Sequence, residues 1–136
     1  MIDYISRPEE EWKKELTKEQ YEVMRGDTVE IPYTGEYLTT IKRGFYSCAG
    51  CGTELFSSKT KFDHGSGWAC FSDTVQEDLL GTRFGTRLGT EQTEVFCNTC
   101  KSHMGHLFKD GPVTKNDGTR YSINSCSLTF KKSEKR

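Results

Sequence analysis

The cysteines of this chain occur mainly as two identically spaced pairs, Cys48 with Cys51 and Cys97 with Cys100. A Cys-x-x-Cys pair presents two thiolates on one tight turn, and two such turns supply the four sulfurs of a tetrahedral Zn²⁺ site. Such a site is closed and structural, because no coordination position remains for a substrate. We therefore expect one structural zinc ion per chain, joining two segments that lie far apart in the sequence.

The rival interpretations of these pairs are a disulfide framework and a thioredoxin-like redox motif. The chain starts without an apolar leader and has no run long enough to span a membrane, so we expect a cytoplasmic protein, in which disulfides rarely persist. A redox Cys-x-x-Cys usually occurs once and near a βαβ pattern, and neither condition holds here. The pattern therefore favours metal.

Composition limits the other function classes. The 136 residues indicate a single domain over 1–136, and the net charge of −1 argues against a nucleic-acid partner, which usually meets a basic face. The short basic run at 131–136 is typical of a solvated tail. We expect a monomer that binds neither nucleic acid nor membrane.

Two further stretches carry polar and aromatic side chains that a β core held together by zinc does not need. In 61–71, closely spaced glycines present Trp68, which could pack in the core or form the wall of a pocket. In 102–112, His103 and His106 precede Asp110 in what reads as a loop-rich stretch. Histidines beside an aspartate often move protons, although a buried structural histidine is the plainer alternative.

A third group lies near the C-terminus. Arg120, Ser122 and Asn124 alternate along an expected strand, and strand residues at a spacing of two share one face, which Cys126 would also share. Cys70 and Cys126 are the thiols left over once the zinc site is filled. Each could be a small buried hydrophobe or a working redox thiol.

These groups need elements that position them, and the expected helices are confined to 1–26. Ser6 with Glu9, and Thr17 with Gln20, have the spacing of capping boxes that begin two short helices. A β core is expected over 41–130, because short alternating runs are separated by glycines. Its clearest strands cover 45–48, 53–56, 93–97, 121–124 and 127–130.

Taken together and in order, several pieces of the chain resemble the B-type methionine sulfoxide reductases. These pieces cover 46–52, 55–58, 61–63, 65–68, 93–95, 105–108, 110–112 and 120–125. The resemblance implies a mainly β fold of two antiparallel sheets, described as tent-like, with short N-terminal helices and a structural zinc site. It also implies reduction of the R epimer of methionine sulfoxide in oxidised proteins, with thioredoxin or another thiol as the reductant.

The same resemblance assigns roles to the site residues. Trp68 would form the wall against the substrate methyl group, while His103 and His106 would donate protons and pack against the substrate. Asp110 and Asn124 would order the polar side of the site. In this chemistry a thiolate attacks the sulfoxide sulfur, and the resulting sulfenic acid is then reduced by a thiol.

The chain departs from the family at the nucleophile. The family keeps a cysteine there, with Arg120 lowering its pKa, but this chain has Ser122. A serine oxygen cannot pass through a sulfenic acid or a disulfide, so we expect an inactive chain in which serine is an engineered replacement. Alternatively the serine is natural and Cys126 or Cys70 works instead, or the pocket only binds methionine sulfoxide. The family's resolving cysteine, where present, corresponds to Ser66.

Overall fold

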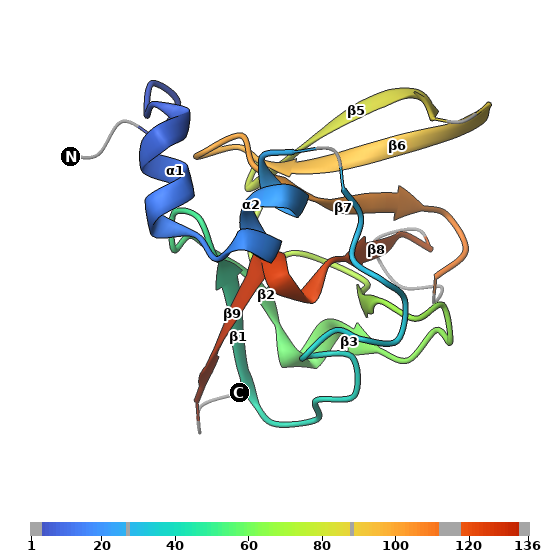
Figure 1. The fold of residues 1–136 in the computed structure, drawn as a ribbon. Coiled ribbons are helices and arrows are strands. Elements are labelled where there is room, and N and C mark those ends of the chain that lie inside the picture. The colour runs from blue at the N-terminus through green and yellow to red at the C-terminus, as the bar shows by residue number, and fades with distance from the viewer. Residues whose placement is uncertain (1–3, 27, 88, 112–117, 134–136) are drawn as a thin grey trace.

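Two antiparallel sheets and two short helices make up the part of the chain that the structure describes (Figure 1). The computed structural model describes residues 4–26, 28–87, 89–111 and 118–133. Helices α1 (Glu9–Glu15) and α2 (Lys18–Met24) precede all the strands, as the sequence predicted. The mainly β fold class with two antiparallel sheets is confirmed.

The strands divide into a small sheet and a large one. The small sheet has the order β2-β1-β9 and the large sheet the order β3-β4-β8-β7-β6-β5. Their bounds are β1 Gly44–Cys48, β2 Glu54–Ser57, β3 Lys61–Phe62, β4 Ala69–Phe71, β5 Leu80–Arg87, β6 Thr90–Cys97, β7 His103–Phe108, β8 Arg120–Ile123 and β9 Leu128–Lys132. Two 3₁₀ turns, η1 (Ser58–Thr60) and η2 (Ser125–Ser127), lead into β3 and β9. The five clearest predicted strands correspond to β1, β2, β6, β8 and β9.

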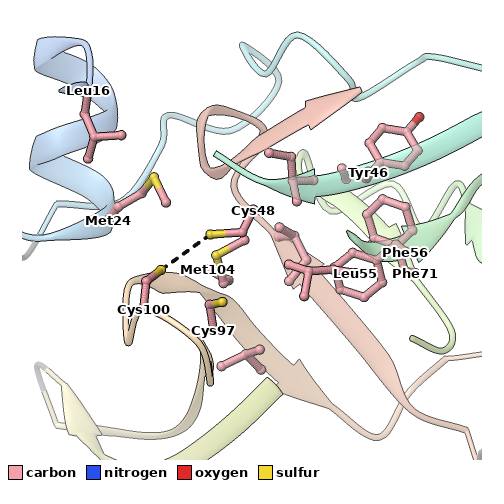
Figure 2. Packing of buried hydrophobic residues seen from close by; sticks show 14 of the residues in the cluster. Leu16, Met24, Tyr46, Cys48, Leu55, Phe56, Phe71, Cys97, Cys100 and Met104 are labelled. Atoms are coloured by element: carbon pink, nitrogen blue, oxygen red, sulfur yellow. Dashed lines mark hydrogen bonds between the residues drawn. The ribbon is translucent and has the colours of Figure 1, made fainter. Parts of the chain in front are cut away.

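An aromatic core joins the two sheets (Figure 2). Phe56 of β2 stacks on Phe71 of β4 with ring centroids 4.3 Å apart, and Tyr46 of β1 meets the edge of the same Phe71 ring at 5.1 Å. All three side chains are fully buried. Burial of one such side chain stabilises a fold by roughly 1.5–3 kcal/mol, so these contacts fix the sheets against each other.

The helices pack on the body through one apolar face, and Trp12, Leu16 and Met24 are buried there. Arg25, at the end of α2, stacks its guanidinium 4.5 Å from the Trp12 ring and donates a hydrogen bond of 3.1 Å to the Cys100 carbonyl. The helical segment is therefore fastened to the turn that carries the second cysteine pair.

One of the two predicted helix starts is correct. Thr17 and Gln20 form the reciprocal hydrogen bonds of a capping box at α2. The capping box predicted for Ser6 is wrong, because α1 begins after Pro8, which makes no side-chain capping bond. The fixed φ of proline and the acidic first turn of α1 favour that start without a hydroxyl cap.

Candidate functional site

The four paired cysteines come together in one cluster, in which all four Sγ atoms lie within 4.8 Å of one another. Cys48 ends β1 and Cys97 ends β6, so each pair sits on the turn that follows a strand. The Sγ atoms of Cys48 and Cys100 are 3.6 Å apart (Figure 2). Those of Cys51 and Cys97 are also 3.6 Å apart. A tetrahedral ion with metal–sulfur bonds of about 2.3 Å needs sulfurs separated by about 3.8 Å. The cluster therefore fits a zinc ion.

The electrostatics of this cluster also call for a cation. A hydrogen bond with Cys48 lowers the pKa of Cys100 to about 7. Hydrogen bonding to Cys100 in turn raises the pKa of Cys48 and the pKa of Cys97. Four crowded sulfurs cannot all become thiolates without a positive charge between them, and a metal ion supplies it.

A second feature is a cavity of about 340 Å³ on one face of the large sheet. Five residues singled out from the sequence border it: Trp68, His106, Arg120, Ser122 and Asn124. Ser66, which corresponds to the family's resolving cysteine, also borders it, and the structure adds Val29, Gln92, Gly105 and Phe108 to the lining. Asp110, His103, Cys70 and Cys126 are not among the described residues that border this cavity.

The pairing of β4, β8, β7 and β6 places four opposed residues in one row, and Ser122 and His106 of this row border the cavity. Ser122 of β8 lies opposite Cys70 of β4 on one side and opposite His106 of β7 on the other. His106 lies opposite Glu94 of β6. Directly opposed residues in antiparallel strands project to the same face, so these four side chains form a row across the sheet.

A bulge brings the two histidines to one face of β7. Residues three apart on a regular strand point to opposite faces, but the register of β6 with β7 shifts by one residue at Met104. The rings of His103 and His106 consequently meet edge to face with centroids 5.3 Å apart. The loop-rich interpretation of this stretch was wrong: the histidines belong to a central strand.

A glycine allows β7 to lie close enough to β8 for this arrangement. A Cβ atom at Gly105 would overlap the carbonyl group of Ser122. Glycine directly before His106 therefore has a steric reason, since only glycine lets the two strands come close enough to place His106 beside Ser122.

The two histidines nevertheless face different spaces. His106 borders both the Ser122 cavity and a neighbouring cavity of about 300 Å³, whereas His103 borders the neighbouring one of the two. His103 Nδ1 lies 2.6 Å from a Glu94 carboxylate oxygen, and Arg83 donates to the other oxygen at 2.8 Å. Burial acts to raise the pKa of Glu94, but the hydrogen bonds from Arg83 and His103 outweigh it and the net shift is downward.

This shift predicts a pH-dependent contribution to stability. A carboxyl group whose pKa is lowered by folding stabilises the protein above its unfolded pKa of about 4.3, and the stabilisation is lost as pH falls through the folded value. We expect Glu94→Gln to lower the free energy of unfolding by about 1 kcal/mol at pH 7, the scale of a partly exposed pair, and to have less effect at pH 3. Urea denaturation at both pH values measures this. Glu54→Gln, an exposed carboxylate on β2, is the matched control; an equal loss at pH 3 and pH 7 would contradict the assignment.

Arg120 is held in place by Asp110. The guanidinium donates to both carboxylate oxygens, at 2.7 and 3.3 Å, and stacks 4.3 Å from the Phe108 ring. The hydrogen bond from Arg120 lowers the pKa of Asp110. His64, which the sequence did not single out, approaches the same carboxylate at 3.5 Å. Asp110 therefore orients the cation of the cavity without bordering the cavity itself.

The segment from Thr28 to Tyr33 crosses the rim of the cavity and ties two of its walls together. Trp68 follows Gly67, whose φ of 98° suits glycine, and donates its indole N–H to the Glu30 carbonyl at 3.0 Å. The Glu30 amide donates to the Asn124 side chain at 3.2 Å. Sequence reasoning missed Glu30, because an isolated acidic residue in an irregular segment carries no periodic signal.

Cys126 does not share the strand face of Ser122, contrary to the sequence expectation. Strand β8 ends at Ile123, and Cys126 lies in the turn η2. Its amide donates to a Glu30 carboxylate oxygen at 3.1 Å. Burial, and then the charge of Glu30, raises the pKa of Cys126 to about 12. Cys126 is therefore poorly suited to redox chemistry in this cavity.

Comparison with known proteins gives a family match. A family model described as the SelR domain matches residues 16–132. A peptide methionine sulfoxide reductase MsrB of Methanosarcina barkeri is 46% identical over 130 residues, covering 96% of this chain and 90% of the relative. The protein of the same name from Leifsonia xyli is 49% identical over 126 residues, covering 93% and 90%.

A solved structure extends the likeness in fold alone. The crystal structure of the Mis18 "Yippee-like" domain superposes with a TM-score of 0.53 at 15% sequence identity, covering 68% of this chain and 98% of that one. Within the part of the chain that the structure describes, neither helix is long or apolar enough to cross a membrane.

Proposed function

We propose, from the premise that the chain belongs to the SelR-domain family of peptide methionine sulfoxide reductases, that its cavity receives methionine-R-sulfoxide side chains of oxidised proteins. The proposal rests on one observation. Trp68, His106, Arg120 and Asn124 border the same cavity as Ser122. An apolar ring suits a methyl group, and a histidine and an amide can donate to a sulfoxide oxygen.

The cavity residues also suit the chemistry of a thiolate at position 122. The thiolate sulfur would attack the sulfoxide sulfur, the oxygen would accept protons from the polar side, and methionine would leave a sulfenic acid behind. Arg120 lies two residues away on the same face and would stabilise the attacking anion. His106 lies directly across the strand from the attacking position, where it could deliver a proton.

We further propose that the chain with Ser122 binds this substrate without turning it over. Ser122 borders the cavity, but a hydroxyl needs a dedicated base, and oxygen cannot be oxidised to the required intermediate. A serine that replaces the cysteine of the family, with every neighbour kept, is what an engineered substitution would produce. The codon at position 122 in the native gene decides this point.

A natural serine enzyme that uses another thiol is the alternative. The position of Cys126 in η2, bonded to Glu30, speaks against that residue. Cys70 is in register with Ser122 but is fully buried and is not among the described residues that border the cavity, which speaks against it as a replacement nucleophile.

We propose that the metal of the four-cysteine cluster is Zn²⁺, one per chain and purely structural. Four thiolates held at tetrahedral spacing are typical of structural zinc, which leaves no position for a substrate. Bound zinc would supply charge neutralisation and a cross-link, while the reaction is left to the cavity. The thioredoxin-type reductant, the cytoplasmic location, the monomeric state and the single-domain boundary 1–136 stay predictions.

Binding experiments test the substrate assignment without requiring turnover. We expect a peptide containing methionine-R-sulfoxide to bind the unaltered chain, and Trp68→Ala to weaken binding about tenfold, since loss of a large apolar wall costs about 1–3 kcal/mol. Isothermal titration with separated R and S peptides measures this. Phe84→Ala, on an exposed ring of β5 outside this cavity, is the control. Equal affinity for both epimers, or no binding at all, would overturn the proposal.

A further inference from the structure

We propose that Cys70 is the second redox thiol of this site, placed to resolve a sulfenic acid formed on a cysteine at position 122. The inference rests on the proposed function, because it concerns the fate of the sulfenic acid that the first reduction step produces. Cys70 itself does not border the cavity, and its role is inferred from its position opposite Ser122.

The first support is strand register. Cys70 and Ser122 are directly opposed partners of β4 and β8, so both side chains project to the cavity face. Cβ atoms of opposed residues lie about 4.5–5.5 Å apart, and a disulfide needs about 3.5–4.5 Å. A movement of about 1 Å between the two strands would therefore join these positions.

The second support is the set of contacts around the Cys70 sulfur. Its Sγ atom lies 3.5 Å from Ser66 Oγ, at the position where members of the family that have a resolving cysteine carry it. Arg120 Nη1 donates a hydrogen bond to the same sulfur at 3.5 Å, which ties Cys70 to a residue that borders the cavity. The thiol thus lies beside both positions at which the resemblance expects sulfur, although in sequence it is four residues past the first.

The burial of Cys70 determines whether it could act as the nucleophile or as the resolving thiol. Its exposed fraction is 0%, and it is not among the described residues that border the cavity, whereas Ser66, Trp68 and Ser122 are. A nucleophile must touch the sulfoxide, whereas a resolving thiol must only reach the oxidised residue. The geometry therefore supports the second role and not the first.

The other cysteines are poorly placed for this step. Four form the metal cluster, and Cys126 lies beyond the end of β8 in a turn whose amides bind Glu30. Cys70 is in no disulfide and outside the metal cluster, so its thiol is available for oxidation.

The chemistry balances without a further reactant until the final reduction. The thiolate at position 122 takes the oxygen from methionine sulfoxide together with one proton from the polar side of the site, so that methionine is released and Cys–SOH remains. The Cys70 thiolate attacks that sulfur, hydroxide leaves with a proton as water, and a disulfide forms. An external dithiol then reduces this disulfide and is itself oxidised. In the chain with Ser122, the same Cys70 has no oxidised partner and stays a thiol.

The test uses the full chain carrying Ser122→Cys, treated with one equivalent of a methionine-R-sulfoxide peptide in the absence of reductant. We expect one methionine per chain, a loss of two free thiols, and a single disulfide between the peptides that contain positions 70 and 122. Adding Cys126→Ala should leave this disulfide in place. Adding Cys70→Ala should abolish it and leave a sulfenic acid that dimedone captures at position 122.

The outcomes separate this inference from the proposed function. Formation of methionine with a disulfide to position 126, or with none, overturns the role of Cys70 and leaves the function standing. If no methionine forms, the proposed function fails. A parallel oxidation of the Ser122→Cys chain by hydrogen peroxide then decides the inference independently, since peroxide forms the same sulfenic acid without substrate. Absence of the 70–122 disulfide in that experiment overturns it.

Discussion

Changing Ser122 to cysteine is expected to raise methionine-R-sulfoxide reduction by at least about a thousandfold, because removing a nucleophile from an otherwise complete site costs rates of this size or more. The cavity already places His106 opposite the reacting position, and Arg120 two residues before it on the same face. The substitution adds only a sulfur atom in place of an oxygen. Release of methionine from a peptide substrate, with dithiothreitol as reductant, measures the gain.

A matched control for this experiment is Ser127→Cys. Ser127 is fully buried in η2 and is not among the described residues bordering the cavity, so a cysteine there adds a thiol without adding a nucleophile. We expect it to remain as inactive as the unaltered chain. Turnover by the unaltered chain at a rate typical of the family, abolished by Cys126→Ala, would contradict the assignment of position 122 as the nucleophile position.

Removal of the metal is expected to lower the melting temperature by about 15 °C. Structural zinc contributes many kcal/mol to the folds it organises, and loss of about 5 kcal/mol in a domain of this size gives a shift of this order. The cluster joins the turn after β1 to the turn after β6, and the second turn also anchors α2 through Arg25 and the Cys100 carbonyl. Chelation should therefore loosen the helices together with both sheets.

The measurement combines metal analysis with thermal unfolding in the presence of a chelator. One zinc per chain is expected before chelation. Cys97→Ser should reproduce the loss of stability, while Cys126→Ser, which leaves the cluster intact, should shift the melting temperature far less. A metal-free chain with the same melting temperature would refute a structural ion.

Local patterns were enough to predict part of this fold. The capping box at Thr17 and the strand before each cysteine pair depend on neighbouring residues, and the structure has both. The start of α1 was missed because Pro8 begins a helix without a hydroxyl cap. The strand β5 was missed because its glycines and threonines follow no apolar alternation, and pairing with β6 along its whole length defines it instead.

The sequence singled out several residues that border the cavity, but it did not predict how they are arranged. The bulge at Met104 reverses which face His103 occupies, and strand spacing alone assigns it to the opposite side from His106. The end of β8 at Ile123 removes Cys126 from the strand face, because a 3₁₀ turn comes next. Both events depend on pairing with distant strands, which a single sequence does not display.

The topology has a consequence for the order in which a nascent chain can fold. Strand β1 pairs with β2 and also with β9, which is synthesised after all the other described strands. All four clustered cysteines precede residue 101. During synthesis the ligand set is therefore complete while one edge of β1 still lacks its neighbour. Metal capture at that stage would hold the two halves of the chain in register and shorten the time that an open strand edge is exposed to other nascent chains.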